Sequence, residues 1–215
     1  LERGQPDVAL TQAQLALDVD PYSAQAYNVK AMALMGLHQL DVAQQAMRRA
    51  TALAPNDLSL QHNLAWVLCA SDDVDGALST FGAVIAAANV APTDATVQAS
   101  KTAAPQFDVA RTYLSLGVCA LQAQRPDVAM AAFDQAQHSA LYADAARFGM
   151  ATMLVQTNDW PGAMRVLAAM SPAQRATPAV QDLQTQIDAQ FERAKALDQT
   201  NHPTGDAQAA PNGAQ

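Results

Sequence analysis

The stretch LDVAQQAMRRATALA (40–54) decides the fold, because its pattern returns along the chain. Its opening tetrapeptide has four relatives, PDVA at 6–9, VDGA at 74–77, PDVA at 126–129 and WPGA at 160–163. The closing alanines are 34 residues apart at positions 9, 43 and 77 and again at 129 and 163, whereas 77 and 129 are 52 apart. The chain therefore repeats every 34 residues, with one insertion of 52 − 34 = 18 residues.

Thirty-four residues is the length of the tetratricopeptide repeat (TPR), which consists of two antiparallel helices, A and B. Other positions keep the same phase. Four residues after the alanines come Met47, Phe81, Phe133 and Leu167. Twelve residues before them come the small residues Ala31, Ala65, Gly117 and Ala151. We predict an all-α TPR solenoid, a right-handed superhelix of antiparallel helix pairs.

The phase of the repeat also sets the predicted domain organisation, a single array over residues 1–198. Its parts are a half repeat (1–23), four repeats (24–57, 58–91, 110–143 and 144–177), an insertion (92–109) and a capping helix (178–198). The half repeat supplies helix B without helix A, so we expect more chain upstream. The insertion is either a tolerated surface excursion or a flap over a groove.

The capping helix is expected because apolar residues follow Pro178 at helical spacing and can seal the last repeat. These residues are Val180, Leu183, Ile187, Phe191 and Ala194. Residues 199–215 mix Pro, Gly, Asn and Ala without periodicity, and we expect them to form a disordered tail.

Composition excludes several functional classes. A formal net charge of −8 with no Lys/Arg cluster disfavours nucleic acid as a partner. No stretch approaches the roughly 18 apolar residues of a membrane span. The sequence has no Gly-rich phosphate loop, and His38, His62, His138 and His202 are scattered without metal-ligand spacing. We therefore predict a protein that binds another protein, with no catalytic residue, cofactor or metal.

The A helices of stacked repeats line a concave wall, and four positions of each helix point at whatever is bound there. The predicted partner-binding groove comprises Asn28, Met32, Met35, His62, Trp66, Arg111, Leu114, Val118 and Phe148. Its apolar centre suits an amphipathic helix or an extended apolar peptide, with methionine adaptable and Trp66 a natural anchor. The alternative is that Trp66 and Phe148 are covered by the insertion or by a neighbouring helix.

A second recognition mode, the clamp that holds acidic peptide tails, is disfavoured. Asn63 and Arg111 fall at positions that resemble such a clamp, but Asn28 replaces the expected lysine and Met32 the expected asparagine. Recognition of a carboxylate depends on cationic donors of this kind.

The two cysteines, Cys69 and Cys119, fall late in the A helices of neighbouring repeats. They are either bonded to each other, across a loop of about fifty residues, or two buried free thiols that fill small core sites. The spacing alone leaves both possibilities open.

The cysteine-bearing segments NLAWVLCASDDVDGALSTF (63–81) and YLSLGVCALQAQRPDVAMAAF (113–133) resemble the type IV pilus biogenesis lipoproteins of the PilF/PilW family. The matching positions are Asn63, Leu64, Ala65, Trp66, Leu68, Cys69, Leu116, Gly117 and Cys119. The resemblance implies a periplasmic, outer-membrane-associated assembly factor whose partner is a secretin or pilus-assembly subunit. It also implies a lipid anchor on an N-terminal cysteine that this chain lacks, and it favours the Cys69–Cys119 bridge.

Two other functions remain open from the sequence. One is a cytoplasmic TPR co-chaperone or secretion chaperone with reduced cysteines, and the other is the TPR domain of an enzyme whose catalytic part lies elsewhere.

Overall fold

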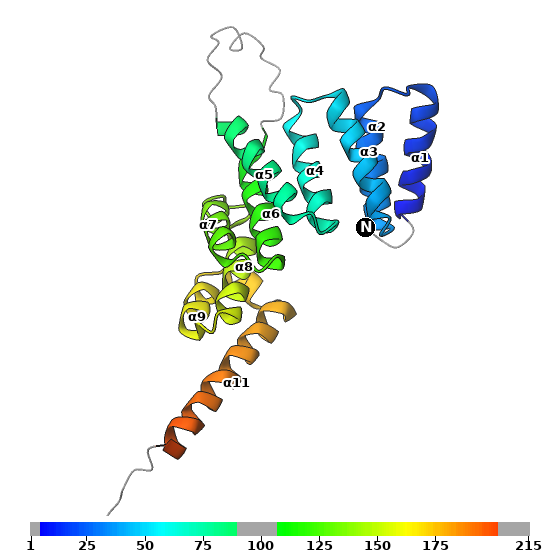
Figure 1. Cartoon of the computed structure of the whole chain (residues 1–215). Helices are drawn as coiled ribbons and strands as arrows, with labels where there is room; N and C mark the ends of the chain where they lie inside the picture. The colour runs from blue at the N-terminus through cyan, green and yellow to red at the C-terminus, as the bar shows by residue number, and fades with distance from the viewer. Residues whose placement is uncertain (1–4, 90–106, 202–215) are drawn as a thin grey trace, which may run out of the picture.

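The computed structural model describes residues 5–89 and 107–201, and within these ranges the regular structure is entirely helical. The elements, in chain order, are α1 (Gln5–Val19), α2 (Ala24–Gly36), α3 (Leu40–Leu53), α4 (Leu58–Ala70), α5 (Val74–Asn89), α6 (Val109–Gln122), α7 (Pro126–Ala136), α8 (Ala143–Gln156), α9 (Trp160–Ala168), α10 (Pro172–Arg175) and α11 (Pro178–Asn201). Figure 1 shows α1 at one end of a curved row of helical hairpins and α11 projecting from the other end.

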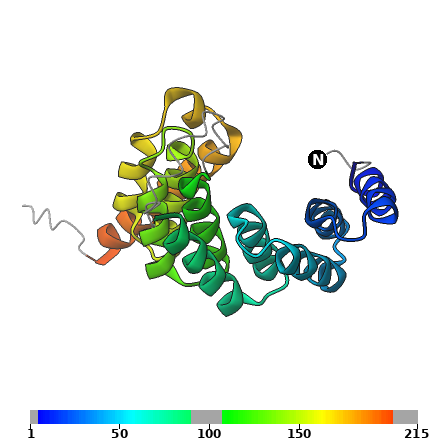
Figure 2. The same cartoon turned by 90° about the horizontal axis from the view of Figure 1, so that it is seen from above.

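The hairpins α2–α3, α4–α5, α6–α7 and α8–α9 each pair an A helix with a B helix, and each B helix also contacts the next A helix. Figure 2, seen from above, shows these hairpins side by side in one continuous arc. The order and pairing confirm the predicted all-α TPR solenoid.

Small residues explain why the paired helices approach closely. The alanines that define the repeat in the B helices, Ala43, Ala77, Ala129 and Ala163, are all 0% exposed. The small residues twelve positions earlier lie in the A helices and are equally buried, as Ala31, Ala65 and Ala151 show. Larger side chains fill the space beside each contact, chiefly Met47, Phe81, Phe133 and Leu167. The core is therefore a line of similar clusters that runs between the A and B helices.

Each turn from an A helix to its B helix contains one residue with a left-handed backbone. These residues are His38 (φ 59°), Asp72 (φ 64°), Gln124 (φ 55°) and Asn158 (φ 61°). The N–H of the following residue donates to the carbonyl five positions earlier, at 2.8–3.0 Å in all four turns. This hydrogen bond ends the A helix and reverses the chain in the same way in every repeat.

The C-terminal helix α11 seals the array over only part of its length. Val180 and Ile187 are 2% and 0% exposed and pack in the core cluster of α8 and α9. Phe191 is 40% exposed and Ala194 is exposed as well. The prediction that these two residues help to seal the last repeat is wrong, because α11 continues beyond α9 and projects away from it (Figure 1).

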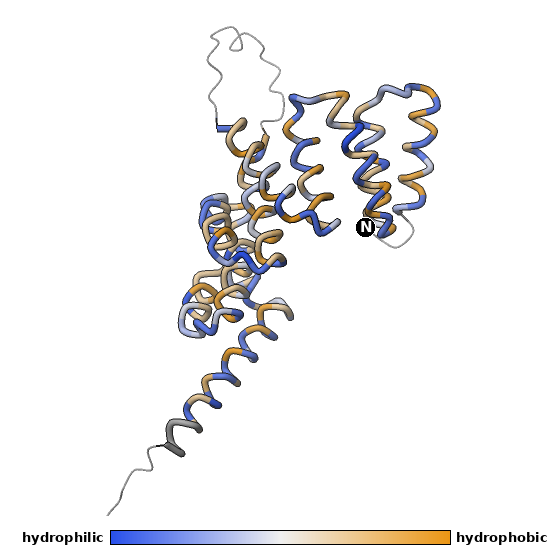
Figure 3. Tube along the Cα trace, viewed as in Figure 1, coloured by the Kyte–Doolittle hydropathy of each residue, from blue (hydrophilic) through white to orange (hydrophobic). Residues whose placement is uncertain are grey.

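Figure 3 shows hydrophobic and hydrophilic residues alternating along α11, as expected for an amphipathic helix. Its described part runs to Asn201, three residues into the predicted tail. The remainder of that tail, most of the predicted insertion and the first four residues lie outside the described residues. No helix in the described part of the chain is long and apolar enough to cross a membrane.

Candidate partner-binding surface

The A helices α2, α4, α6 and α8 form a wall, because each of them contacts the next A helix in the row. Most of the residues predicted to bind a partner are half-buried on these helices: Asn28, Met32, Met35, Trp66, Leu114, Val118 and Phe148. Arg111 is exposed at the start of α6, and His62 is buried. A half-buried side chain is held in place by its neighbours and still offers surface to a ligand.

The most distinct feature of the wall is a hollow of about 410 Å³ at the C-terminal ends of α2, α4 and α6, which we call the Trp66 hollow. It brings together Met35 and Trp66, two residues of the predicted groove, and Cys69. It is completed by His38, Leu40, Ala70 and Gln122. Apolar walls with a few polar groups are typical of binding sites, and this volume lies in the usual range of about 300–1,000 Å³.

The repeat phase did not predict His38, Leu40 or Gln122 as parts of the hollow. His38 and Leu40 belong to the α2–α3 turn and its exit, whereas Gln122 is the last residue of α6. Their proximity to Trp66 depends on how far successive hairpins are rotated, which the sequence period does not specify. No position of the repeat marks these three residues in the sequence.

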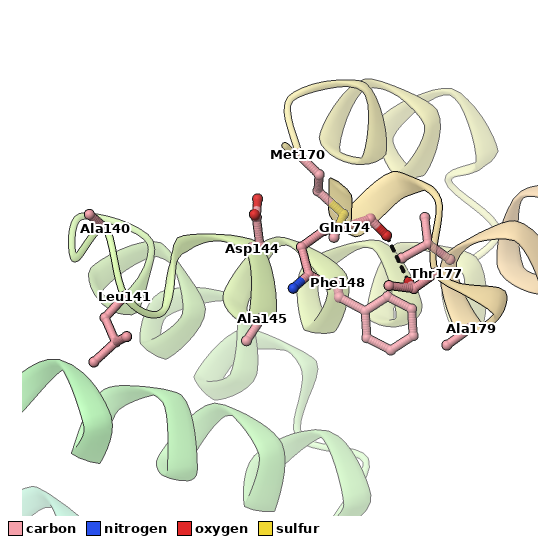
Figure 4. Close-up of a pocket in the computed structure, with 10 residues that line it drawn as sticks. Ala140, Leu141, Asp144, Ala145, Phe148, Met170, Gln174, Thr177 and Ala179 are labelled. Atoms are coloured by element: carbon pink, nitrogen blue, oxygen red, sulfur yellow. Dashed lines mark hydrogen bonds between the residues drawn. The ribbon is translucent and has the colours of Figure 1, made fainter. Parts of the chain in front are cut away.

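A second hollow, of about 510 Å³, lies at the other end of the wall, and we call it the Phe148 hollow. Figure 4 shows the ring of Phe148 beside Gln174 and Thr177, with Met170 nearby and Leu141 and Ala145 farther along α8 and its preceding turn. The hydroxyl of Thr177 donates to the carbonyl oxygen of Gln174 at 2.7 Å, which fixes the turn between α10 and α11.

Among the described residues that line the Phe148 hollow, Asp144 is the charged one. Its Oδ1 accepts a hydrogen bond from the Ser171 N–H at 3.0 Å and lies 3.6 Å from Nη1 of Arg147. The hydrogen bonds from Ser171 lower the pKa of the Asp144 carboxyl, and the Arg147 guanidinium acts in the same direction. Asp144 is therefore ionised and already paired, so its main role is to fasten α8 to the segment before α10.

His62 does not lie on the open surface of the wall. It is 3% exposed, and its Nδ1 lies 3.0 Å from Oγ1 of the buried Thr112 on α6. Its ring also meets Phe81 edge-on, with ring centroids 5.6 Å apart. Burial lowers the pKa of His62 from 6.5 to about 4, and the positive charge of Arg111 adds to this effect. The prediction that His62 contacts a partner is wrong, because the α4–α6 contact encloses it as a neutral core residue.

Polar side chains also join the A helices to one another. Nδ2 of Asn63 on α4 donates to Oδ1 of Asn28 on α2 at 2.9 Å. This bond satisfies part of both amides and holds the two helices in register. Asn63 and Asn28 therefore have a structural role in the wall, and each amide retains further capacity for a peptide backbone.

A disulfide connects the wall across the two halves of the array. Cys69 on α4 and Cys119 on α6 are bonded, with Cα atoms 6.0 Å apart and a sequence separation of 50 residues. Cys119 is fully buried, whereas Cys69 borders the Trp66 hollow. The bridge therefore fixes the position of one side of the hollow relative to α6.

In the described ranges, no group of three or more His, Cys, Asp or Glu side chains is arranged to hold a metal ion. The lining of both hollows, as given by the described residues, contains neither Lys nor Arg. The surface thus offers apolar contact, amide hydrogen bonding and partial negative charge.

Comparison with protein families identifies tetratricopeptide repeats at residues 24–57 and 120–187. No match to the chain was found among curated protein sequences.

Several solved TPR structures share the fold. PilF of Pseudomonas aeruginosa is 17% identical, with 90% of this chain and 86% of that chain covered and a TM-score of 0.60. MamA of Desulfovibrio magneticus RS-1 is 20% identical, with 86% and 89% covered and a TM-score of 0.59. YrrB, described as a TPR protein with an unusual peptide-binding site, is 15% identical, with 88% and 97% covered and a TM-score of 0.56. At these identities the likeness concerns the fold alone.

Proposed function

We propose that this TPR solenoid is a scaffold that holds a segment of another protein against its A-helix wall. The observation that carries the proposal is the Trp66 hollow, where Met35, Trp66 and Gln122 from three successive A helices meet around one cavity. Aromatic side chains in such pockets supply much of the binding energy at protein interfaces. The proposed function requires no catalytic step.

The proposed setting is the bacterial envelope, with a secretin or pilus-assembly subunit as the partner. Two observations support it. The cysteine-bearing segments resemble the PilF/PilW family, and the two cysteines of those segments are bonded. Disulfides persist in oxidising compartments such as the periplasm and are rare in the cytosol. Attachment to the outer membrane would be through an N-terminal lipid anchor.

The direct test is capture of the partner by purified wild-type protein and by the double variant Trp66→Ala/Phe148→Ala. Envelope extract of the source organism is passed over each protein, and the retained secretin and pilus subunits are quantified by mass spectrometry. We expect the double variant to lose most of this capture while its circular dichroism remains helical. Trp66→Ala alone provides the same test at the first hollow if Phe148→Ala loosens the C-terminal end.

The matched control is Leu15→Ala/Val19→Ala, which removes two exposed apolar side chains from α1, a helix that contributes no residue to the lining of either hollow. Undiminished capture by the Trp66→Ala/Phe148→Ala protein would refute the proposed binding surface. The compartment is tested separately by titrating thiols in protein isolated from cells under alkylating conditions. Two free thiols would contradict an envelope location and favour a cytoplasmic chaperone role.

A further inference from the structure

In the sequence, exposed aspartates follow two of the residues that line the Trp66 hollow. Leu40 lines it, and the exposed Asp41 follows directly at the start of α3. Ala70 lines it too, and the exposed Asp72 and Asp73 follow in the α4–α5 turn. We call Asp41, Asp72 and Asp73 the acidic edge. The α2–α3 and α4–α5 turns therefore supply residues both to the lining of the hollow and to the acidic edge.

The charge of this edge is not neutralised by the described part of the chain. The ion pairs found there are Arg125–Asp75, Arg147–Asp144 and Lys195–Glu192, so none involves the acidic edge. One carboxylate has an internal role, because Oδ1 of Asp73 accepts the Gly76 N–H at 3.1 Å, and this bond leaves its charge in place. The side chains of Asp41 and Asp72 are exposed.

Charge complementarity indicates which kind of protein segment fits the Trp66 hollow. An acidic or phosphorylated segment would need cationic donors, and the lining of the hollow has no Lys or Arg among the described residues. A purely apolar segment would leave the acidic edge without a counter-charge. A segment with one large apolar side chain and flanking Lys or Arg residues satisfies both parts of the site. The net charge of −8 would also accelerate its approach.

We infer that the segment held at the Trp66 hollow is basic and amphipathic, with an apolar side chain against Met35 and Trp66 and its cations at the acidic edge. This inference rests on the proposed function and adds the chemistry of the partner to it.

The test uses the full chain with Trp160→Phe, which leaves Trp66 as the single tryptophan reporter. The probes are three synthetic amphipathic peptides that share their apolar residues and carry Lys, Gln or Glu at the remaining positions. Each peptide is titrated while Trp66 fluorescence is followed at low and high salt. We expect the Lys peptide to bind about tenfold more tightly than the Gln peptide at low salt, and this advantage to shrink at high salt.

The variant Asp41→Asn/Asp72→Asn should remove that advantage, since asparagine keeps the size of each side chain and tolerates the left-handed backbone at position 72. Asp182→Asn/Asp188→Asn on α11 is the matched control, because it changes the net charge equally at a distant site. Equal loss in both variants would overturn the acidic edge as the cause. Equal or tighter binding of the Glu or Gln peptide would overturn the inference while sparing the binding surface. No change in Trp66 fluorescence with any peptide would overturn both.

Discussion

The two ends of the solenoid obey the same repeat phase and yet differ in what they expose. At the C-terminal end, Met170 is 4% exposed because α11 covers it with Val180 and Ile187. At the N-terminal end, Ala16 occupies the position equivalent to Met170 and is exposed. The outer face of α1 also presents Leu15 at 61% and Val19 at 88% exposure.

The difference shows that a position in the repeat is buried by its neighbouring helix and not by its own. The residues equivalent to Ala16 in the inner repeats, Ala50, Val84 and Ala136, are all 0% exposed because helices pack on both sides of them. Helix α1 packs on α2, and Ala13 and Leu17 are buried in that contact. In a solenoid, each end is therefore only as stable as the element that covers it.

The largest loss of stability is expected from a substitution at the C-terminal end, which α11 covers. Ile187→Ala removes a fully buried side chain from the contact of α11 with the last repeat and should lower the free energy of unfolding by about 2–5 kcal/mol. Ile187→Val is the control and should cost about 0.5–1.5 kcal/mol. Urea unfolding followed by circular dichroism measures both, and near-wild-type stability of Ile187→Ala would mean that α11 does not seal the array.

The buried His62 tests the stability of the middle of the array, between the two ends. Its pKa is lowered to about 4 in the folded state, so the neutral form is favoured by folding. Its contribution to stability is complete above its unfolded pKa of about 6.5 and is lost progressively as the pH falls toward 4. The shift corresponds to about 3 kcal/mol between these limits.

The measurement compares unfolding free energies at pH 7 and at pH 4 to 5 in wild type, His62→Gln and the exposed-residue control His138→Gln. We expect His62→Gln to show the smallest loss on acidification, while His138→Gln follows wild type. If the whole array unfolds in a single transition at low pH, it is one cooperative unit. The two ends would then not differ in stability.

Gly149 lies on α8 in the last repeat and faces Phe133 across the α7–α8 contact. A Cβ atom at Gly149 would collide with the Phe133 ring, and one at Gly117 would lie 2.6 Å from the same ring. Gly149→Ala should therefore destabilise the protein by about 1–3 kcal/mol, despite the higher helix propensity of alanine. Phe133→Leu should relieve part of the Gly149→Ala cost in a double-mutant cycle, and additive effects would show that the collision is not its cause.

The left-handed turn residues predict a small increase in stability from a substitution that lies at neither end of the array. Gln124 adopts φ 55°, a conformation that suits Gly, Asn, Asp or His better than Gln. Gln124→Gly should stabilise the array by about 0.5–1 kcal/mol, after allowing for the greater freedom of glycine in the unfolded chain. A lower midpoint of thermal unfolding for Gln124→Gly would contradict this account of the turns.

The smallest effect is expected at the open end. Leu15→Ala and Val19→Ala remove apolar side chains that contribute little to the described core, so each should change stability by less than about 0.5 kcal/mol. A loss comparable with that of Ile187→Ala would show that the outer face of α1 is covered in solution, and the contrast between the ends would then disappear.

The features that recur with the period of the sequence were predictable. The buried alanines Ala43 and Ala77 and the paired small residues Ala31 and Ala65 follow from a spacing that can be counted. The boundary of the seal was not predictable, because Phe191 continues the apolar pattern of Val180 and Ile187 beyond the point where α9 ends. Amphipathic spacing shows which face of a helix is apolar but not how far its partner extends.

The candidate site was predicted only in part for the same reason. Phe148 occupies the same repeat position as His62, and yet only His62 is enclosed. Its enclosure depends on Thr112, which lies 50 residues away on the other side of the insertion. The hollows likewise include Gln122 and Gln174, whose positions follow from the rotation between hairpins and from the short helix α10. Contacts of this kind are set by packing between repeats, which a period cannot encode.

The bond between Cys69 and Cys119 has a further consequence for how the chain is held together. The peptide backbone joins α5 to α6 through residues 90–108, and the disulfide joins α4 to α6 independently of that path. Cleavage of any single peptide bond between Asn89 and Phe107 would therefore leave one covalent molecule under non-reducing conditions. The molecule has two separate covalent routes between its halves, and a protease can remove only one of them.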